Sequence, residues 1–220
     1  MDSVLTARSE AAEASGRLED LVPLGALLAD MGRFDEADDV YKRALAAYDD
    51  VSPFPLAWTC FQLGMLWGEL ASEPDPSRAT RWYRRALEYV SGYVKARVHL
   101  AEIVTEDGDL AEAEALLVPV LESGDPEVAW RLADVFAKQG KDEQAAAQLN
   151  AARVGFEALL ARHPMAFADH AAEFYAGSGG SLARALELAR ANAANRPTRR
   201  AVAQADSLHL RLTMSQGRPT

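Results

Sequence analysis

Residues 29–48, "ADMGRFDEADDVYKRALAAY", join the end of one amphipathic segment to the beginning of another. Gly32 lies between them, and glycine is the residue that most readily takes the left-handed conformation ending a helix. Apolar side chains then recur at helical spacing: Phe34, Ala37, Val40, Tyr41, Ala44, Leu45 and Tyr48. The stretch predicts two antiparallel helices joined by a short turn, and we expect the acidic run at 35–39 to face solvent.

The same pattern recurs along the chain, which indicates a repeat and not a single hairpin. A turn glycine, an alanine five residues later and a larger residue four beyond that form three sets: Gly32, Ala37, Tyr41; Gly108, Ala113, Leu117; and Gly140, Ala145, Leu149. Two further sets match in part: Ala79, Tyr83, Ala86 and Gly180, Ala185, Ala189. Each is preceded by a helix with a small residue at 25, 64, 101, 133 or 172, which we expect to face the alanine of the second helix.

These motifs resemble the tetratricopeptide repeat family, whose pattern of about 34 residues contains L-G-x-x-Y and A-x-x-x-F. The first piece is best kept in "LGALL" (24–28) and "LGMLW" (63–67), and the second in "ADDVYKRA" (37–44) and "ATRWYRRA" (79–86). The leading tryptophan of the family is absent from the first four units, where Leu21, Cys60, Arg97 and Ala129 take its place.

The resemblance implies an all-α, right-handed α-solenoid of antiparallel helix pairs. We expect an N-terminal helix within residues 1–19, about five repeat units within 20–195, and a capping helix and tail in 196–220. The family's usual role implies a non-enzymatic adaptor that binds a protein or peptide.

Charge narrows the classes of partner. The 220 residues carry 33 acidic and 23 basic side chains, a net charge of -10, which argues against nucleic acid. Residues 1–50 hold 12 acidic and 5 basic side chains, whereas residues 196–220 hold five arginines and one aspartate. This asymmetry favours head-to-tail self-association or an anionic partner at the C-terminal end, with an ordinary solvated surface as the alternative.

No apolar run approaches the roughly 18 residues of a membrane span, so we expect no membrane span and a cytoplasmic location. A signal peptide that had already been removed by processing would not be detected in this sequence. The single cysteine, Cys60, excludes an intramolecular disulfide and is expected to be a buried thiol.

No nucleophile, phosphate-loop or zinc-protease motif is present, so we expect no enzymatic activity and no cofactor. One alternative stays open. Asp169, His170 and Glu173 lie within about one helical turn, which would suit a metal- or small-molecule-binding accessory protein. We expect no resident metal there, and His99 is interpreted as a packing residue.

The first helices of such pairs line the concave side of the array. We expect its groove to contain Trp58, Phe61, Met65, Glu69, Lys95, Val98, Glu102, Trp130, Asp134, Lys138, Asp169 and Glu173. Trp58, Phe61 and Trp130 fit either the groove or the core. Aromatic anchors beside mainly acidic side chains predict a basic or basic-apolar partner segment.

Overall fold

The computed structural model describes residues 2–216, and within that range it is built of helices and contains no β-strand. The all-α prediction is therefore confirmed. No helix in this range combines the length and the apolar character that crossing a membrane requires. The chain divides into two compact units, Met1–Pro119 and Val120–Thr220, which are described separately.

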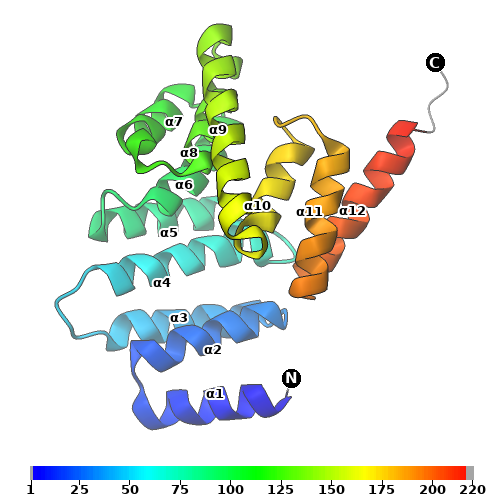
Figure 1. Cartoon of the computed structure of the whole chain (residues 1–220). Helices are drawn as coiled ribbons and strands as arrows, with labels where there is room; N and C mark the ends of the chain where they lie inside the picture. Colours follow the sequence, from blue (N-terminus) through cyan, green and yellow to red (C-terminus); the bar gives the residue numbers. More distant parts are fainter. Residues whose placement is uncertain (1, 217–220) are drawn as a thin grey trace. The chain divides into compact units, whose positions relative to one another are not determined.

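Unit 1 consists of an N-terminal helix followed by three antiparallel helix pairs (Figure 1). Its elements are α1 (Asp2–Ser15), α2 (Leu18–Asp30), α3 (Phe34–Ala47), α4 (Phe54–Met65), the π-helical turn η1 (Leu66–Leu70), α5 (Pro76–Tyr89), α6 (Val94–Glu106) and α7 (Leu110–Leu117). Helices α2, α4 and α6 are the first helices of their pairs. Each packs most extensively on the second helix of its own pair. A 3-10 helix, η2 (Val118–Ser123), follows α7.

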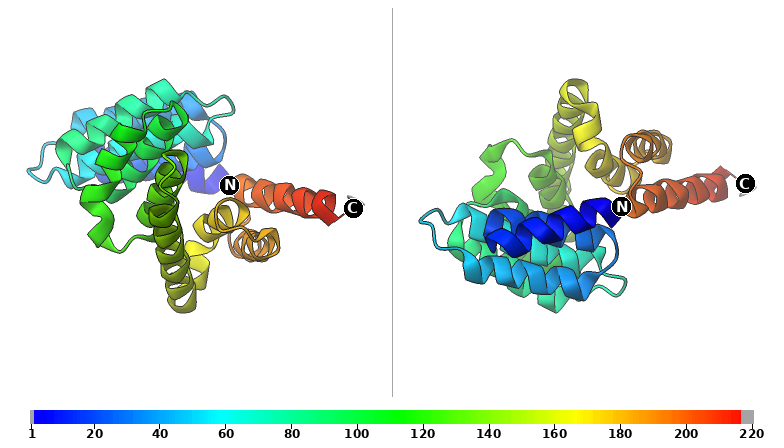
Figure 2. Two further views of the ribbon diagram at one scale, coloured as in Figure 1. Left: turned by 90° about the horizontal axis from the view of Figure 1, so that it is seen from above. Right: turned by 90° about the horizontal axis from the view of Figure 1, so that it is seen from below.

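Unit 2 contains two complete pairs and one further helix. Its elements are α8 (Pro126–Lys138), α9 (Asp142–Arg162), α10 (Pro164–Ala176), α11 (Leu182–Asn195) and α12 (Arg199–Gln216). Helix α9 is the longest in residues 2–216. Helix α12 lies at the edge of this unit (Figure 2) and packs against α11.

The turns at Gly32, Gly108 and Gly140 share one geometry, as the repeat predicts. Gly32 has φ 78°, and the Arg33 amide donates to the Leu28 carbonyl oxygen at 2.9 Å. Gly108 and Gly140 have φ 89° and 72° and are followed by the equivalent hydrogen bond, again at 2.9 Å. This bond satisfies a helix-end carbonyl that would otherwise lack a partner.

In the first two pairs the glycine of the first helix faces a tyrosine and not the expected alanine. A Cβ atom added to Gly64 would lie 2.2 Å from Cε1 of Tyr83, and one added to Gly25 would lie 2.8 Å from Cε1 of Tyr41. The alanine of the second helix sits one turn away, where Ala79 Cβ would be 3.2 Å from a Cβ on Gly68. Glycine is required because each tyrosine ring lies directly on the backbone of the first helix.

Candidate partner-binding surface

The predicted groove residues divide into buried and accessible side chains. Phe61, Val98 and Trp130 are 7%, 1% and 5% exposed, so they are packing residues and contribute no surface that a partner could reach. Trp58 is 40% exposed. The others are accessible. Lys138 is exposed, and the remaining side chains are half-buried: Met65, Glu69, Lys95, Glu102, Asp134, Asp169 and Glu173.

An aromatic cluster lies beneath Trp58 on the first helices of unit 1. Trp58 packs on Phe61 with ring centroids 6.0 Å apart, and Phe61 contacts Tyr93 at 5.5 Å. Tyr93 also contacts Phe54 edge-on at 5.7 Å. Phe54 is 52% exposed and lies one turn before Trp58, so the two rings form one apolar surface on α4. Sequence reasoning missed Phe54, although its i,i+4 spacing to Trp58 was a usable signal.

His99 completes this cluster from below and is a packing residue, as interpreted from the sequence. Its ring stacks on Tyr83 at 5.7 Å and meets Phe61 edge-on at 5.3 Å. Its Nδ1 lies 2.7 Å from Oε1 of Glu69, and the imidazole side chain is 11% exposed. Glu69 therefore has an internal partner on α6, which reduces its availability to a bound segment.

Asp38 corrects the expectation that the acidic run at 35–39 faces solvent. It is 2% exposed. Its carboxylate lies 2.6 Å from Lys42 Nζ and 2.7 Å from an Arg78 guanidinium nitrogen, and it accepts a hydrogen bond from Trp67 Nε1 at 2.9 Å. The Arg78 guanidinium also stacks 3.6 Å above the Trp67 ring. A buried carboxylate with three donors joins the first pair of unit 1 to the second.

The π-helical turn η1 explains how one helix end reaches both neighbouring pairs. It follows α4 directly and carries Trp67, which bonds Asp38 of α3, and Glu69, which pairs with His99 of α6. A π turn widens the helix and rotates the following side chains. The Asp75 amide then donates to the Trp67 carbonyl at 2.7 Å, which closes the inserted loop.

In unit 2, Trp130 belongs to the core, which settles the alternative left open by the sequence. Its ring packs on Phe174 at 5.6 Å and on Phe156 at 6.3 Å, and these two stack at 5.0 Å. Trp130 Nε1 donates to Ser178 Oγ at 3.3 Å, and that hydroxyl donates to Asp134 Oδ1 at 2.5 Å. Burial raises the pKa of Asp134 above its ordinary value, and the Ser178 hydrogen bond opposes the shift.

The remaining acidic groove candidates of unit 2 form contacts with neighbouring elements. Asp169 lies 3.2 Å from Arg196, and Glu173 lies 3.2 Å from Arg200 on α12. His170 Nδ1 lies 2.5 Å from Oε1 of Glu127, which is 4% exposed. Across residues 2–216, no group of three or more His, Cys, Asp and Glu side chains is arranged to hold a metal ion.

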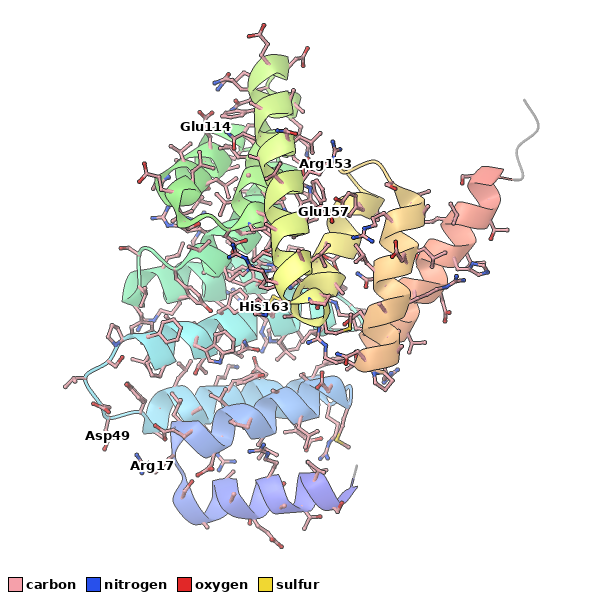
Figure 3. The ribbon with its side chains drawn as sticks, viewed as in Figure 1. Arg17, Asp49, Glu114, Arg153, Glu157 and His163 are labelled. Carbon is pink, nitrogen blue, oxygen red and sulfur yellow. The ribbon has the colours of Figure 1, made fainter. Side chains whose placement is uncertain are left out.

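Glu157 of α9 joins the two pairs of unit 2 (Figure 3). It accepts a hydrogen bond from the Tyr175 hydroxyl at 2.6 Å and lies 3.3 Å from Arg184 of α11. Arg153, one turn earlier, donates to the Gly179 carbonyl at 3.2 Å. These polar contacts occupy the face of α9 that meets α10 and α11.

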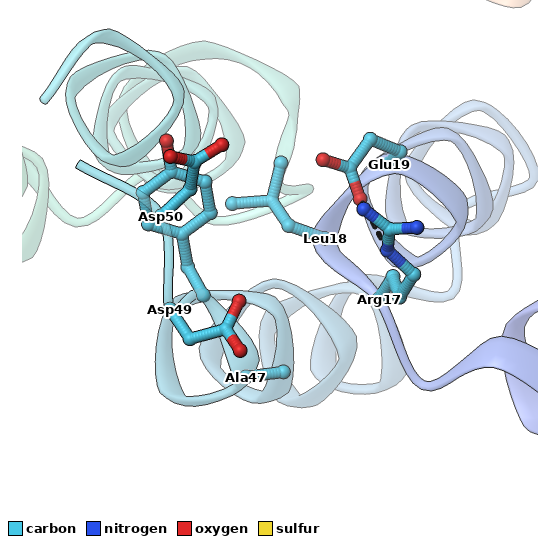
Figure 4. A pocket seen from close by; sticks show the side chains of 7 residues that line it. Arg17, Leu18, Glu19, Ala47, Asp49 and Asp50 are labelled. Carbon is cyan, nitrogen blue, oxygen red and sulfur yellow. Dashed lines mark ion pairs between the residues drawn. The ribbon is translucent and has the colours of Figure 1, made fainter. Parts of the chain in front are cut away.

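A hollow of about 190 Å³ opens at one end of the first pair (Figure 4). It lies between the start of α2, with Arg17 and Glu19, and the loop after α3, with Asp49 and Asp50. Arg17 pairs with Glu19 at 3.5 Å across exposed side chains. The hollow has a largely polar lining with three carboxylates, and this places negative charge at the end of α3 from which the chain leads to Phe54.

Cys60 is buried, as expected from its place in α4. Burial raises the pKa of its thiol from 9.0 to about 12. A thiol held neutral in this way is a poor nucleophile at neutral pH, and it acts as an apolar packing group.

Antiparallel helix pairs stacked on their neighbours define an α-solenoid. Solved tetratricopeptide-repeat structures share this architecture, and the chain has the tetratricopeptide-repeat fold. It is similar to MamA, with 18% identity and a TM-score of 0.57 over 71% of this chain and 88% of MamA. It is also similar to YrrB, a TPR protein with an unusual peptide-binding site, with 18% identity and a TM-score of 0.53 over 91% of this chain and 98% of YrrB.

A third similar structure is TTC0263, a thermophilic TPR protein of Thermus thermophilus. It shares 21% identity and a TM-score of 0.50 over 88% of this chain and 99% of TTC0263. At such identities the likeness establishes the fold alone. No protein-family model matches the sequence, and no curated protein matches it.

Proposed function

We propose that the chain is a non-enzymatic protein-interaction scaffold that binds a basic-apolar partner segment in a groove along its first helices. The observation that carries the proposal is the aromatic surface of α4, where Phe54 and Trp58 are 52% and 40% exposed. Large aromatic side chains standing together on a surface are typical anchors of protein interfaces.

The charge of unit 1 supports a partner with basic side chains. This unit holds 22 acidic and 11 basic side chains, whereas unit 2 holds 11 and 12. Asp49 and Asp50 are exposed and precede Phe54 by only a few residues. Arginine or lysine of a bound segment would meet these carboxylates, and it could also stack on the exposed face of Trp58.

The rest of the proposed groove consists of the accessible first-helix residues. Met65, Lys95 and Glu102 are the further candidates in unit 1, and Asp134, Lys138, Asp169 and Glu173 are the candidates in unit 2. YrrB, a similar structure, is described as having a peptide-binding site. A peptide ligand is therefore a reasonable class of partner for this chain.

The test is selection of binders from a random peptide library on the purified chain, followed by titration of the selected peptides. We expect enrichment of sequences that combine Arg or Lys with large apolar residues. Phe54→Ala with Trp58→Ala should weaken their binding at least about tenfold, which corresponds to about 1.4 kcal/mol. Val154→Ala is the matched control, because Val154 is 62% exposed on α9 in the other unit.

Two results would contradict this function. One is a library that yields no binder under conditions where the chain is folded by circular dichroism. The other is a set of binders whose affinity for the Phe54→Ala, Trp58→Ala variant equals that for the Val154→Ala control.

A further inference from the structure

Helix α12 exposes apolar side chains on the face turned away from unit 2. Val202, Leu210 and Met214 are 43%, 63% and 74% exposed and lie at i,i+4 multiples along one side of the helix. Its opposite side is buried on α11 through Ala201, with Ala205 and Leu208 further along. Asp206, which is also exposed, lies between Val202 and Leu210 on this side. The helix thus has one partnered face and one solvent-exposed face whose larger side chains are mostly apolar. Exposed apolar surface of this kind marks an interaction site more often than chance.

Polar contacts hold α12 firmly in place, so the exposed face is presented on a fixed helix. Arg200 pairs with Glu173 at 3.2 Å, and Arg211 donates to the Ala176 carbonyl at 2.9 Å. Gln204 donates to the Asp169 carbonyl at 3.3 Å. These contacts all lie on the partnered side, which leaves Val202, Leu210 and Met214 available.

Helix α1 offers a complementary face in unit 1. Its inner side packs against α2 through Leu5 and Ala12, whereas Val4 is 52% exposed. Exposed alanines at 7, 11 and 14 continue the outer stripe at i,i+3 and i,i+4 spacing from Val4. The small alanines would allow another helix to approach the α1 backbone closely.

The charges of the two helices also match. Helix α12 carries Arg199, Arg200 and Arg211 against Asp206, whereas α1 carries Glu10 and Glu13 against Arg8. Counted over the whole of each helix, these residues give α12 a net positive charge and α1 a net negative charge, so long-range attraction favours α1 over a second α12 as the partner.

We propose that the exposed face of α12 binds α1 of a second copy of this chain, so that copies associate head to tail. This contact would resemble those within the array, in which each helix is covered by the next one along the solenoid. The two faces differ, so the interface is heterologous, and each bound copy leaves one α1 and one α12 uncovered for further association.

The experiment measures the mass of the purified chain by sedimentation equilibrium over a concentration series, at low and at high salt. We expect average mass to rise with concentration without stopping at a dimer, and association to weaken as salt screens the charge pairing. The double variant Leu210→Glu, Met214→Glu blocks the exposed face of α12. The double variant Val4→Glu, Ala11→Glu blocks the exposed face of α1. Each variant alone should be monomeric, with a Kd raised at least about tenfold.

Mixing the two blocked variants is the decisive step. Each retains one intact face, so an equimolar mixture should form a dimer and nothing larger. Val154→Glu is the control, because it adds the same charge at an exposed apolar site on α9 and should associate like the unmodified chain.

Three outcomes would overturn the proposal. They are an unmodified chain that is monomeric throughout, a Val4→Glu, Ala11→Glu variant that still self-associates through α12 alone, and a mixture that forms no dimer. None of them bears on peptide binding at Phe54 and Trp58, so the two proposals fail independently. Circular dichroism of each variant checks that exposed-site changes leave the fold intact.

Discussion

The two units share one repeat but use their aromatic residues and charges differently. In unit 1 the aromatic cluster reaches the surface, with Phe54 and Trp58 exposed above Phe61. In unit 2 the aromatic residues Trp130 and Phe174 are buried and pack on each other. The same residue type thus serves as a candidate anchor in one unit and as core in the other.

The charge balance follows the same division. Unit 1 has a net charge of 11 negative, whereas unit 2 is close to neutral. In unit 2 the acidic groove candidates Asp169 and Glu173 pair with arginines of the next elements. In unit 1, Asp49 and Asp50 are exposed. A basic partner segment is therefore expected to prefer unit 1.

Replacing a tryptophan should affect the two units very unequally. Trp130→Ala removes a buried ring between Phe156 and Phe174 and should lower the free energy of unfolding by about 4 kcal/mol. Trp58→Ala removes a ring that is 40% exposed and should cost about 1 kcal/mol or less. Urea denaturation followed by circular dichroism measures both, and equal losses would refute the division into core and surface tryptophans.

Gly64→Ala should destabilise unit 1 by about 3 kcal/mol, because the new Cβ would lie 2.2 Å from the Tyr83 ring. Tyr83→Leu in the same chain should recover part of the loss, since the third pair combines Ala101 with Leu117. Gly92→Ala is the control, because a Cβ there has nothing within 4 Å. If both glycine variants lose the same stability, the close contact between residue 64 and the Tyr83 ring is not the cause of the loss.

Asp38→Ala should lower the free energy of unfolding by about 2 kcal/mol, because it leaves Arg78 and the Trp67 indole without their shared acceptor. Asp39→Ala, at the exposed neighbouring position, should change it by less than about 0.5 kcal/mol. Thermal or urea unfolding of the two variants checks this difference. A similar small effect for both would mean that the polar contact between pairs adds no stability.

The smallest expected effect concerns Cys60, the only cysteine of the sequence. Chemical labelling of this buried thiol reports on unit 1 alone. Its pKa is raised to about 12 in the folded chain, so the reactive thiolate is scarce at pH 8. The unfolded thiol ionises near its ordinary pKa, and stability contributed by this group is therefore lost as pH rises above that value. Iodoacetamide labelling should be slow in buffer and fast in urea, and rapid labelling in buffer would indicate local opening of α4.

The repeat was accessible from the amino-acid pattern because its signals are local. Turn glycines such as Gly32 and apolar residues at helical spacing depend only on neighbouring backbone geometry. The helices expected within residues 1–19 and 196–220 are present as α1 and α12. The helical hairpins followed from these signals, and the family resemblance carried by the same residues implied the all-α solenoid. The division of the array into an N-terminal helix, repeats and a cap stays a prediction.

The burial of particular side chains depended on contacts between segments far apart in the chain. Asp38 looks like one more acid in an exposed run, and only the arrival of Arg78 and Trp67 from the next pair makes it a buried carboxylate. Trp130 lies three residues before the small residue of its helix, Ala133, as the buried Phe61 does before Gly64, whereas the exposed Trp58 lies six residues before Gly64. Helical periodicity assigns a residue to a face of its own helix, but whether that face meets solvent is decided by the packing of the other helices.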